Sequence, residues 1–233
     1  MKNHLKRVTS PKTWSLPRRE RVFVTRPKPS GHPLSQGMPL GVVIRDILHL
    51  ASTMSEVKKV LNNKDVLVDG KRRKDHRFLL GLFDTLSFPL LNKHYRVSLD
   101  EDSHLTLLDI KADEASIKLC KIVGKSVVPG GKVQFHLHDG RNVFGKENLH
   151  VGDTVMLTLP DQKIQKAFPL KAGMMVFLDA GKKAGQRGML HSVTGHEAIY
   201  TVDGQEINTV TKYLFVVGEK EAATTISVKH PTQ

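Results

Sequence analysis

The 233-residue sequence predicts an α+β protein made of several small modules. Three observations support this prediction. Residues 1–30 are strongly basic and have no helical or strand period, residues 40–61 contain two apolar stripes at helical spacing, and residues 92–217 contain short strand-like runs between turn residues. We therefore expect five segments, with bounds at 1–37, 38–91, 92–170, 171–218 and 219–233.

The first segment is a basic arm followed by a strap rich in proline and glycine. Residues 1–30 contain nine Lys and Arg and one acidic residue, Glu20, and so carry +8 of the formal net charge of +13. Such a composition does not bury enough apolar surface to fold alone, so we expect an extended arm outside any folding core. Lys and Arg paired with phosphates release counterions, which suits the arm to a polyanion. The alternative is a solvated tail, but the interleaved Trp14 and Phe23 favour a nucleic acid.

The second segment predicts two helices and a hairpin. Apolar residues at helical spacing predict a first helix over 40–51. Thr53 and Glu56 form a capping-box pattern that opens a second helix. A short strand then leads into Asp69-Gly70, a strong hairpin signal, and four basic residues at 71–74 follow directly. We expect a compact unit with a basic edge.

The remaining segments are predicted to be mostly β. In the central β domain, 92–170, we expect hairpins over 95–109 and 154–168, with strands between them joined at Asp139-Gly140. The segment 171–218 contains further short strands and the turn Asp203-Gly204. Short strands at close spacing indicate small barrels or sandwiches. Residues 219–233 read as a loose tail.

Composition limits the class of partner. A net charge of +13 indicates an anionic partner, either a nucleic acid or a membrane surface. No apolar run is long enough for a membrane span, and no apolar stretch follows the basic start, so no secretory signal is predicted. Cys120 is the single cysteine, which excludes an intrachain disulfide and favours a reducing, cytoplasmic setting. Its apolar neighbours predict a core residue rather than a nucleophile.

No enzymatic motif is found in the sequence, and we expect no cofactor and no small-molecule substrate. The chain has twelve histidines, and His136 and His138 fall on one face of a predicted strand. No further ligand lies at zinc-site spacing, so we predict no metal and interpret these histidines as surface or RNA-facing residues.

Residues 53–71, TMSEVKKVLNNKDVLVDGK, closely resemble the RNA-binding module named after bacterial small-subunit ribosomal protein four. The resemblance implies that basic residues of the second helix and the hairpin face RNA. Family members often have Arg just inside the second helix, where this chain has Met54. The alternative interpretation of Lys58 and Lys59 is a solvated helix face.

The run GKKAGQRG at 181–188 resembles the KOW motif, a loop of small SH3-like barrels in translation and transcription proteins. Its glycines, Gly181, Gly185 and Gly188, are expected to let the backbone approach a phosphate closely. No Gly-Lys-Ser/Thr ending is present, so the run is not a P-loop. A plain flexible hairpin turn is the alternative.

Read in order, these parts resemble one family over nearly the whole chain, the e-type small-subunit ribosomal protein four of archaea and eukaryotes. Matching residues include 4–7, Trp14, 45–46, 118–121 and the loop at 181–188. The resemblance implies an arm, a helical RNA-binding module, a central β domain and a C-terminal SH3-like KOW barrel. It also implies a non-catalytic role in translation and subunit assembly on the cytoplasmic ribosome. The absence of a long C-terminal extension favours an archaeal member.

The implied partners are small-subunit ribosomal RNA and neighbouring small-subunit proteins, with no membrane. Two rival functions stay open from the modules alone: an RNA-modifying enzyme, such as a pseudouridine synthase or methyltransferase, and a free transcription or translation factor. The residues expected to bind RNA are Lys2, His4, Lys6, Arg7, Lys12, Trp14, Arg18, Arg19, Arg21, Arg26, Lys28, Arg45, Lys58, Lys59, Lys64, Lys71, Arg72, Arg73, Lys74, Lys182, Lys183 and Arg187.

Overall fold

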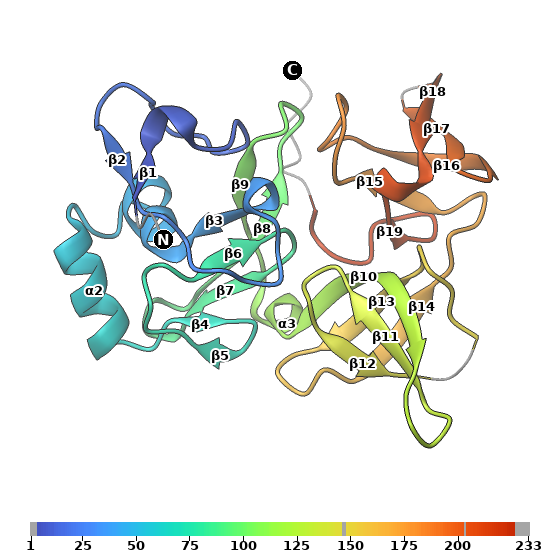
Figure 1. The fold of residues 1–233 in the computed structure, drawn as a ribbon, viewed down its shortest axis with the longest axis horizontal. Helices are drawn as coiled ribbons and strands as arrows, with labels where there is room; N and C mark the ends of the chain where they lie inside the picture. The colour runs from blue at the N-terminus through green and yellow to red at the C-terminus, as the bar shows by residue number, and fades with distance from the viewer. Residues whose placement is uncertain (1–3, 146–147, 203, 227–233) are drawn as a thin grey trace.

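The computed structural model describes residues 4–145, 148–202 and 204–226 and is built on three five-stranded antiparallel sheets. In Figure 1 the first sheet and helix α2 (Met54–Asn63) lie on the left, and the second and third sheets lie below and above on the right. Strands dominate and helices are few, so the α+β prediction is confirmed in this coarse form. In the described residues no helix is long and apolar enough to span a membrane.

The first sheet has the strand order β5-β4-β7-β8-β9. Its strands are β4 (Leu67–Val68), β5 (Lys71–Arg72), β7 (Thr85–Phe88), β8 (Lys93–Leu99) and β9 (Leu105–Asp109). β4 and β5 form the predicted hairpin, in which Asp69 and Gly70 have φ angles of 51° and 72°. Two successive positive φ angles are what a tight two-residue hairpin turn requires, which accounts for the Asp-Gly sequence.

The two helices precede this sheet. The predicted capping box is present at the start of α2, where the Thr53 hydroxyl accepts from the Glu56 amide at 3.2 Å. The first helix is shorter than the predicted 40–51. It consists of α1 (Leu40–Val42) and a π-helical turn, Val43–Ile47, and His49 then has a left-handed backbone with φ of 51°. A residue with left-handed backbone ends a helix. The apolar residues at helical spacing therefore continue to residue 51, although the helix ends at Ile47.

The hairpin of β8 and β9 corrects the predicted domain boundary. The sequence placed it in the central β domain, but β8 pairs with β7 from Thr85↔Arg96 to Phe88↔Lys93. The sheet of the helical unit therefore continues to Asp109, past the boundary expected at residue 91. The same residue types form turns inside a sheet and turns between domains. The sequence pattern therefore did not show that the turn before β8 lies inside the first sheet.

The second sheet has its own small core. Its order is β12-β11-β10-β13-β14, and α3 (Ala112–Ala115) leads into it. Its strands are β10 (Ile117–Val127), β11 (Val133–Leu137), β12 (Asn142–Phe144), β13 (Thr154–Thr158) and β14 (Ile164–Phe168). Cys120, Ile122, Phe135, Val155 and Leu157 are buried together, which confirms the interpretation of Cys120 as a core residue.

The third sheet shares a core with the first. Its order is β18-β17-β16-β15-β19. Its strands are β15 (Met175–Leu178), β16 (Arg187–Thr194), β17 (Glu197–Val202), β18 (Gln205–Val210) and β19 (Leu214–Gly218). The Phe83 ring lies 5.5 Å from the Phe177 ring and 4.6 Å from the Phe215 ring, measured between centroids. These aromatic contacts lie within one cluster of buried apolar residues that includes side chains of both sheets.

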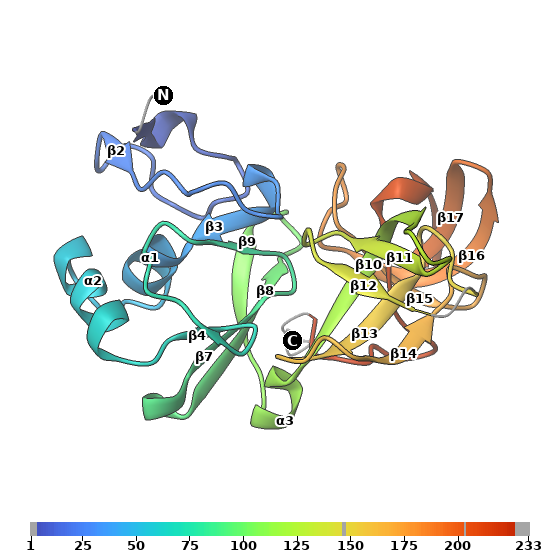
Figure 2. The ribbon, with the colours of Figure 1, turned by 60° about the horizontal axis from the view of Figure 1, so that its bottom comes forward.

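The arm is packed against the protein, so the prediction of an extended arm outside any core is wrong. β1 (Leu5–Lys6) pairs with β2 (Phe23–Val24), and β3 (Gly37–Pro39) pairs with β6 (Leu79–Gly81). Trp14 is 2% exposed, and its Nε1–H donates to the Gly37 carbonyl at 2.7 Å. Figure 2 shows the arm folded back beside β3 and β9. The Trp14 indole supplies buried apolar contact area, which the basic composition of the arm did not indicate.

The start of the predicted C-terminal tail is also packed. Ile226 is buried, and its carbonyl accepts from the Ser98 hydroxyl. The Thr225 amide and hydroxyl both donate to the Glu114 carboxylate at 3.0 Å. The segment 219–226 is therefore not a loose tail, and the rest of the predicted tail, 227–233, lies outside the described residues.

Candidate nucleic-acid interface

Exposed cations gather where α2 meets the β4–β5 hairpin. The Arg72 Nη2 donates to the Asn62 carbonyl at 3.0 Å, and its Nε lies 3.0 Å from the Asp65 carboxylate. Both contacts tie the hairpin to the C-terminal end of α2. Lys58 and Lys59 are exposed one helical turn before Asn62 and therefore lie close to the hairpin.

The arm joins this surface just beyond the hairpin. The Lys28 amide donates to the Arg77 carbonyl, and the Arg77 Nε donates to the Arg26 carbonyl, both at 2.9 Å. The Lys28 ammonium also forms an ion pair with Asp75. Residues 26–28 of the arm are thereby held alongside the residues that follow the basic run at 71–74.

The pKa of His76 reports the gathering of positive charge. Burial lowers this pKa most, and Lys58, Arg77 and Lys28 lower it further, while Asp75 acts in the opposite direction. Cations from α2, the arm and the intervening loop thus act on one imidazole. We call the surrounding surface the basic face; its residues are Arg26, Lys28, Lys58, Lys59, Lys64, Lys71, Arg72 and Lys74, all exposed.

Several residues expected to bind RNA do not lie on an exposed surface. Arg7 is 1% exposed and Trp14 is 2% exposed, so neither side chain is presented on the outer surface. Arg45 is paired with its neighbour Asp46 through two hydrogen bonds, at 3.0 and 2.8 Å. The Arg73 guanidinium lies 4.3 Å from the centroid of the Phe78 ring. Lys2 lies outside the described residues.

The other arm cations are exposed, with the exception of Arg18. Arg18 is half-buried and donates to the carbonyls of Val8 and Pro11, each at 3.1 Å. The remaining predicted residues of this segment are exposed; they are His4, Lys6, Lys12, Arg19 and Arg21.

The glycine loop at 181–188 packs on protein rather than leaving its backbone open. A Cβ on Gly185 would lie 1.9 Å from the Asp100 carbonyl oxygen, and one on Gly188 would lie 2.4 Å from that of Thr201. The Ser103 hydroxyl also donates to the Ala184 carbonyl at 3.0 Å. The prediction that these two glycines give a phosphate close access to the backbone is therefore wrong.

The cations of this loop remain available. Lys182, Lys183 and Arg187 are exposed around the packed glycines. Gly181 has φ of 96°, and a Cβ on this glycine would lie 3.5 Å from the ring of Tyr213, an ordinary contact distance. The loop thus presents charge on a backbone fixed by internal contacts.

A buried ionic cluster, missed by sequence reasoning, joins the first and second sheets. The Lys118 Nζ lies 2.9 Å from the Asp69 carboxylate, 2.5 Å from that of Asp84 and 2.9 Å from that of Asp139. Arg141 forms further ion pairs with Asp69 and Asp139. Asp69 and Asp84 come from the first sheet and the other residues from the second, so the cluster fixes the two sheets against each other.

The cluster has strongly shifted pKa values. Burial acts to lower the pKa of Lys118, but the neighbouring carboxylates outweigh it and hold this pKa well above its usual value. Burial acts to raise the pKa of Asp139, but Lys118, His138 and Arg141 lower it to about 2. The Lys118 ammonium and the Asp139 carboxylate are therefore both charged at neutral pH.

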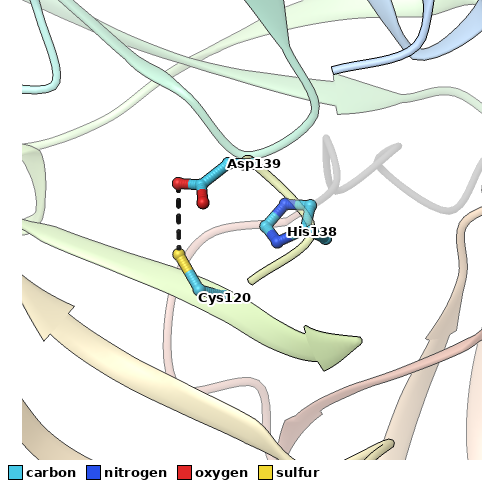
Figure 3. A group of neighbouring side chains, drawn as sticks. All are labelled: Cys120, His138 and Asp139. Carbon is cyan, nitrogen blue, oxygen red and sulfur yellow. Dashed lines mark hydrogen bonds between the residues drawn. The ribbon is translucent and has the colours of Figure 1, made fainter. Parts of the chain in front are cut away.

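One corner of this cluster has the geometry of a metal site. Figure 3 shows Cys120, His138 and Asp139, whose ligand atoms lie within 4.8 Å of one another. The protonation and pairing of these three side chains disfavour the binding of a metal cation. Burial holds the pKa of the Cys120 thiol well above its usual value, and Lys118 already neutralises Asp139.

Both nitrogens of the His138 ring also have protein partners. Its Nδ1 lies 3.3 Å from the Lys121 amide, which donates to it, and its Nε2 lies 3.4 Å from the Leu82 carbonyl. These contacts fix the neutral ring with the proton on Nε2. The expected surface role is therefore wrong for His138, and we assign no metal to this corner.

Two half-buried groups, His138 and Asp179, act in opposite directions on stability in acid. Burial lowers the pKa of His138 to about 3 from an unfolded value of 6.5, so the unfolded chain gains a proton first as the pH falls below 6.5, and stability is lost. Burial raises the pKa of Asp179 to about 6 from 3.8, with Lys121 and Lys212 acting the other way. There the folded chain gains the proton first between pH 6 and 3.8, and stability is gained.

We therefore expect the free energy of unfolding to change little between pH 6 and pH 4 and to fall steeply below that. An Asp179→Asn variant lacks the opposing group and should lose stability continuously as the pH falls below about 6. Urea midpoints measured across this range on parent and variant test the prediction. Parallel pH profiles for the two proteins would contradict it.

Comparisons with known proteins agree with this architecture. A family model described as "Ribosomal family S4e" matches residues 91–164, and one described as "RS4NT (NUC023) domain" matches residues 1–35. Small ribosomal subunit protein eS4 of Methanocella arvoryzae is 39% identical over 227 residues, covering 95% of this chain and 96% of that protein. Its counterpart in Methanocaldococcus jannaschii is 37% identical over 238 residues, covering 94% and 96%.

A solved structure is also similar. The crystal structure of 30S ribosomal protein S4e from Thermoplasma acidophilum has a TM-score of 0.69 and 28% sequence identity, covering 79% of this chain and 96% of that chain. The family resemblance seen in the sequence is thereby confirmed. With two relatives aligned over nearly their whole length, the chain belongs to the eS4 family of small-subunit ribosomal proteins.

Proposed function

We propose that this protein is a structural constituent of the small ribosomal subunit that binds the subunit's RNA through the basic face and the exposed cations of the arm. The observation that carries the proposal is the convergence of cations from α2, the β4–β5 hairpin and the arm on one surface. Within the described residues, Lys58, Lys59 and Lys71 have no carboxylate at ion-pair distance. Their charge is therefore free to pair with phosphates.

The exposed loop cations extend this proposal to the third sheet. Lys182, Lys183 and Arg187 stand on a loop held rigid by the first sheet, which favours a fixed docking edge for RNA. We interpret the third sheet as the KOW-type SH3-like barrel implied by the sequence. Such contacts read charge and shape rather than base sequence.

The family consists of structural ribosomal proteins and not of enzymes, so we assign this chain no catalytic step and place it on the cytoplasmic ribosome. Neighbouring small-subunit proteins are its expected protein partners. Leu90 and Leu91, which are 68% and 51% exposed at the turn before β8, offer one apolar contact point for such a neighbour.

A charge-removal series tests the RNA contact. We expect the triple change of Lys58, Lys59 and Lys71 to Ser to lower the log–log salt slope of ribosomal RNA binding by about 2 to 3, at roughly 0.7–0.9 for each lost phosphate contact. The matched control changes three exposed lysines outside the basic face, Lys111, Lys132 and Lys171, to Ser. Filter binding to a small-subunit RNA transcript at several salt concentrations measures both. Equal slopes for the triple variant and its control would rule out the basic face as the RNA-binding surface.

A further inference from the structure

Arg7 is a buried cation whose charge is unpaired within the described residues. It is 1% exposed, and its Nε has no hydrogen-bond partner there. In the part of the chain that the structure describes, no carboxylate lies at ion-pair distance from it. An arginine keeps its charge in proteins, and a buried, unpaired charge is strongly unfavourable. The burial of Arg7 therefore implies an anion that the described chain does not itself supply.

A cavity of about 460 Å³ lies beside Arg7. It is formed between the arm on one side and the end of the first helix with the residues that follow it on the other. Arg21 lines it from the arm, and Arg45 and His49 line it from the opposite side. The left-handed backbone at His49, with φ of 51°, ends the helix at this wall and leaves the imidazole exposed at the cavity.

The charges around the cavity leave positive charge uncompensated. Asp46 is another lining residue, but its carboxylate is taken by two hydrogen bonds from Arg45. Glu20 is the remaining carboxylate of the lining and is exposed. The single negative charge of Glu20 is outnumbered by the two positive charges of Arg7 and Arg21. The lining therefore has an excess of positive charge before any charge on His49 is counted.

We propose that this cavity, which we call the Arg7 pocket, binds a phosphodiester group of RNA. The inference rests on the proposed function for the identity of the RNA, whereas the need for an anion rests on Arg7 alone. A guanidinium is suited to this ligand because its planar donors match the oxygens of a phosphate. A phosphate in this pocket would contact both the arm and the end of the first helix. It would therefore stabilise the packed position of the arm.

Inorganic phosphate is the first probe. At constant ionic strength, we expect phosphate in place of chloride to raise the thermal midpoint of the full-length protein. The Arg7→Met variant should fold, should be at least as stable in chloride because a buried unpaired charge is gone, and should show no phosphate response. Arg19→Gln, an exposed arm arginine outside the cavity lining, is the matched control and should respond like the parent. A phosphate response retained by Arg7→Met would overturn the proposal.

Glu20 separates the proposal from its simplest rival, in which Glu20 is the counterion of Arg7. Under the proposal, Glu20→Gln removes a repelling carboxylate from the cavity and should strengthen the phosphate response. Under the rival, Glu20→Gln and Arg7→Met would each lower the midpoint in chloride. That result would show that the protein itself neutralises Arg7.

Ribosomal RNA is the second probe and distinguishes the two sources of phosphate. Arg7→Met should lower the log–log salt slope of RNA binding by about one unit. If phosphate stabilises the parent but Arg7→Met binds RNA with an unchanged slope, the occupant is free phosphate and the RNA assignment is wrong. If the parent itself binds no ribosomal RNA, the proposed function fails, while the phosphate measurement still decides whether the pocket binds an anion.

Discussion

Replacing Lys118 with methionine is expected to destabilise the protein by about 3–5 kcal/mol, the usual cost of removing one partner from a buried ion pair. Lys118 is fully buried and its ammonium is shared by the carboxylates of Asp69, Asp84 and Asp139. Methionine has a similar volume but no charge, so three carboxylates would lose their common cation. Because the cluster joins two sheets, we expect the whole chain to be affected rather than one sheet.

Urea unfolding of the parent and of two controls measures this effect. Lys132→Met changes an exposed lysine and should shift the free energy of unfolding by no more than about 0.5 kcal/mol. Adding Asp84→Asn to Lys118→Met removes one of the stranded carboxylates and should recover part of the loss. A Lys118→Met variant as stable as Lys132→Met would show that the cluster does not hold the two sheets together.

Replacing Trp14 with alanine is expected to cost about 3–5 kcal/mol, as for other buried tryptophans. The Trp14 indole is almost fully buried, and its loss would also leave the Gly37 carbonyl without its 2.7 Å hydrogen bond. Since Gly37 begins β3, which pairs with β6, the change should loosen the contact between the arm and the helical module.

Phe23→Ala is the matched control, because Phe23 belongs to the same arm but is 55% exposed. Its removal should change the free energy of unfolding by less than about 1 kcal/mol. Thermal or urea unfolding of both variants, with the parent alongside, tests the packing of the arm. If both variants change the free energy of unfolding by equally small amounts, the arm is not packed against the protein.

Local signals in the sequence predicted the elements well. The capping box at Thr53 and the hairpin turns at Asp69-Gly70 and Asp139-Gly140 all occur where expected, because each depends on residues within a few positions of one another. The strand pairs over 95–109 and 154–168 also form. These features need no knowledge of the rest of the chain.

Contacts between distant residues were not predictable in the same way. Nothing near Trp14 in the sequence indicates that its indole reaches Gly37, and nothing after β7 indicates that the next hairpin joins the same sheet. Arg7 and Lys6 look alike in a basic run, yet Lys6 is exposed and Arg7 is buried. Burial of a charge depends on the tertiary partner, which a local pattern does not contain.

The ionic cluster did leave one signal in the sequence. Strand periodicity places Lys118 on the same side of β10 as Cys120 and Ile122, so a lysine occupies a position with core neighbours. A buried lysine requires carboxylate partners, and the Asp residues of two hairpin turns were available for this role. Asp69 and Asp139 were interpreted only as turn residues, so their role as ion-pair partners of Lys118 was not predicted. The basic run at 71–74, in contrast, was found because its charges are consecutive.

Sedimentation with ribosomal subunits tests whether this protein is an RNA-bound structural part of the small subunit. Ribosomes from the source cells are washed in high salt, separated into subunits on a gradient, and probed for this chain by quantitative mass spectrometry. We expect about one copy for each small subunit, retained through the wash. Recovery of the chain only in the free fraction at the top of the gradient would contradict it and favour a free factor.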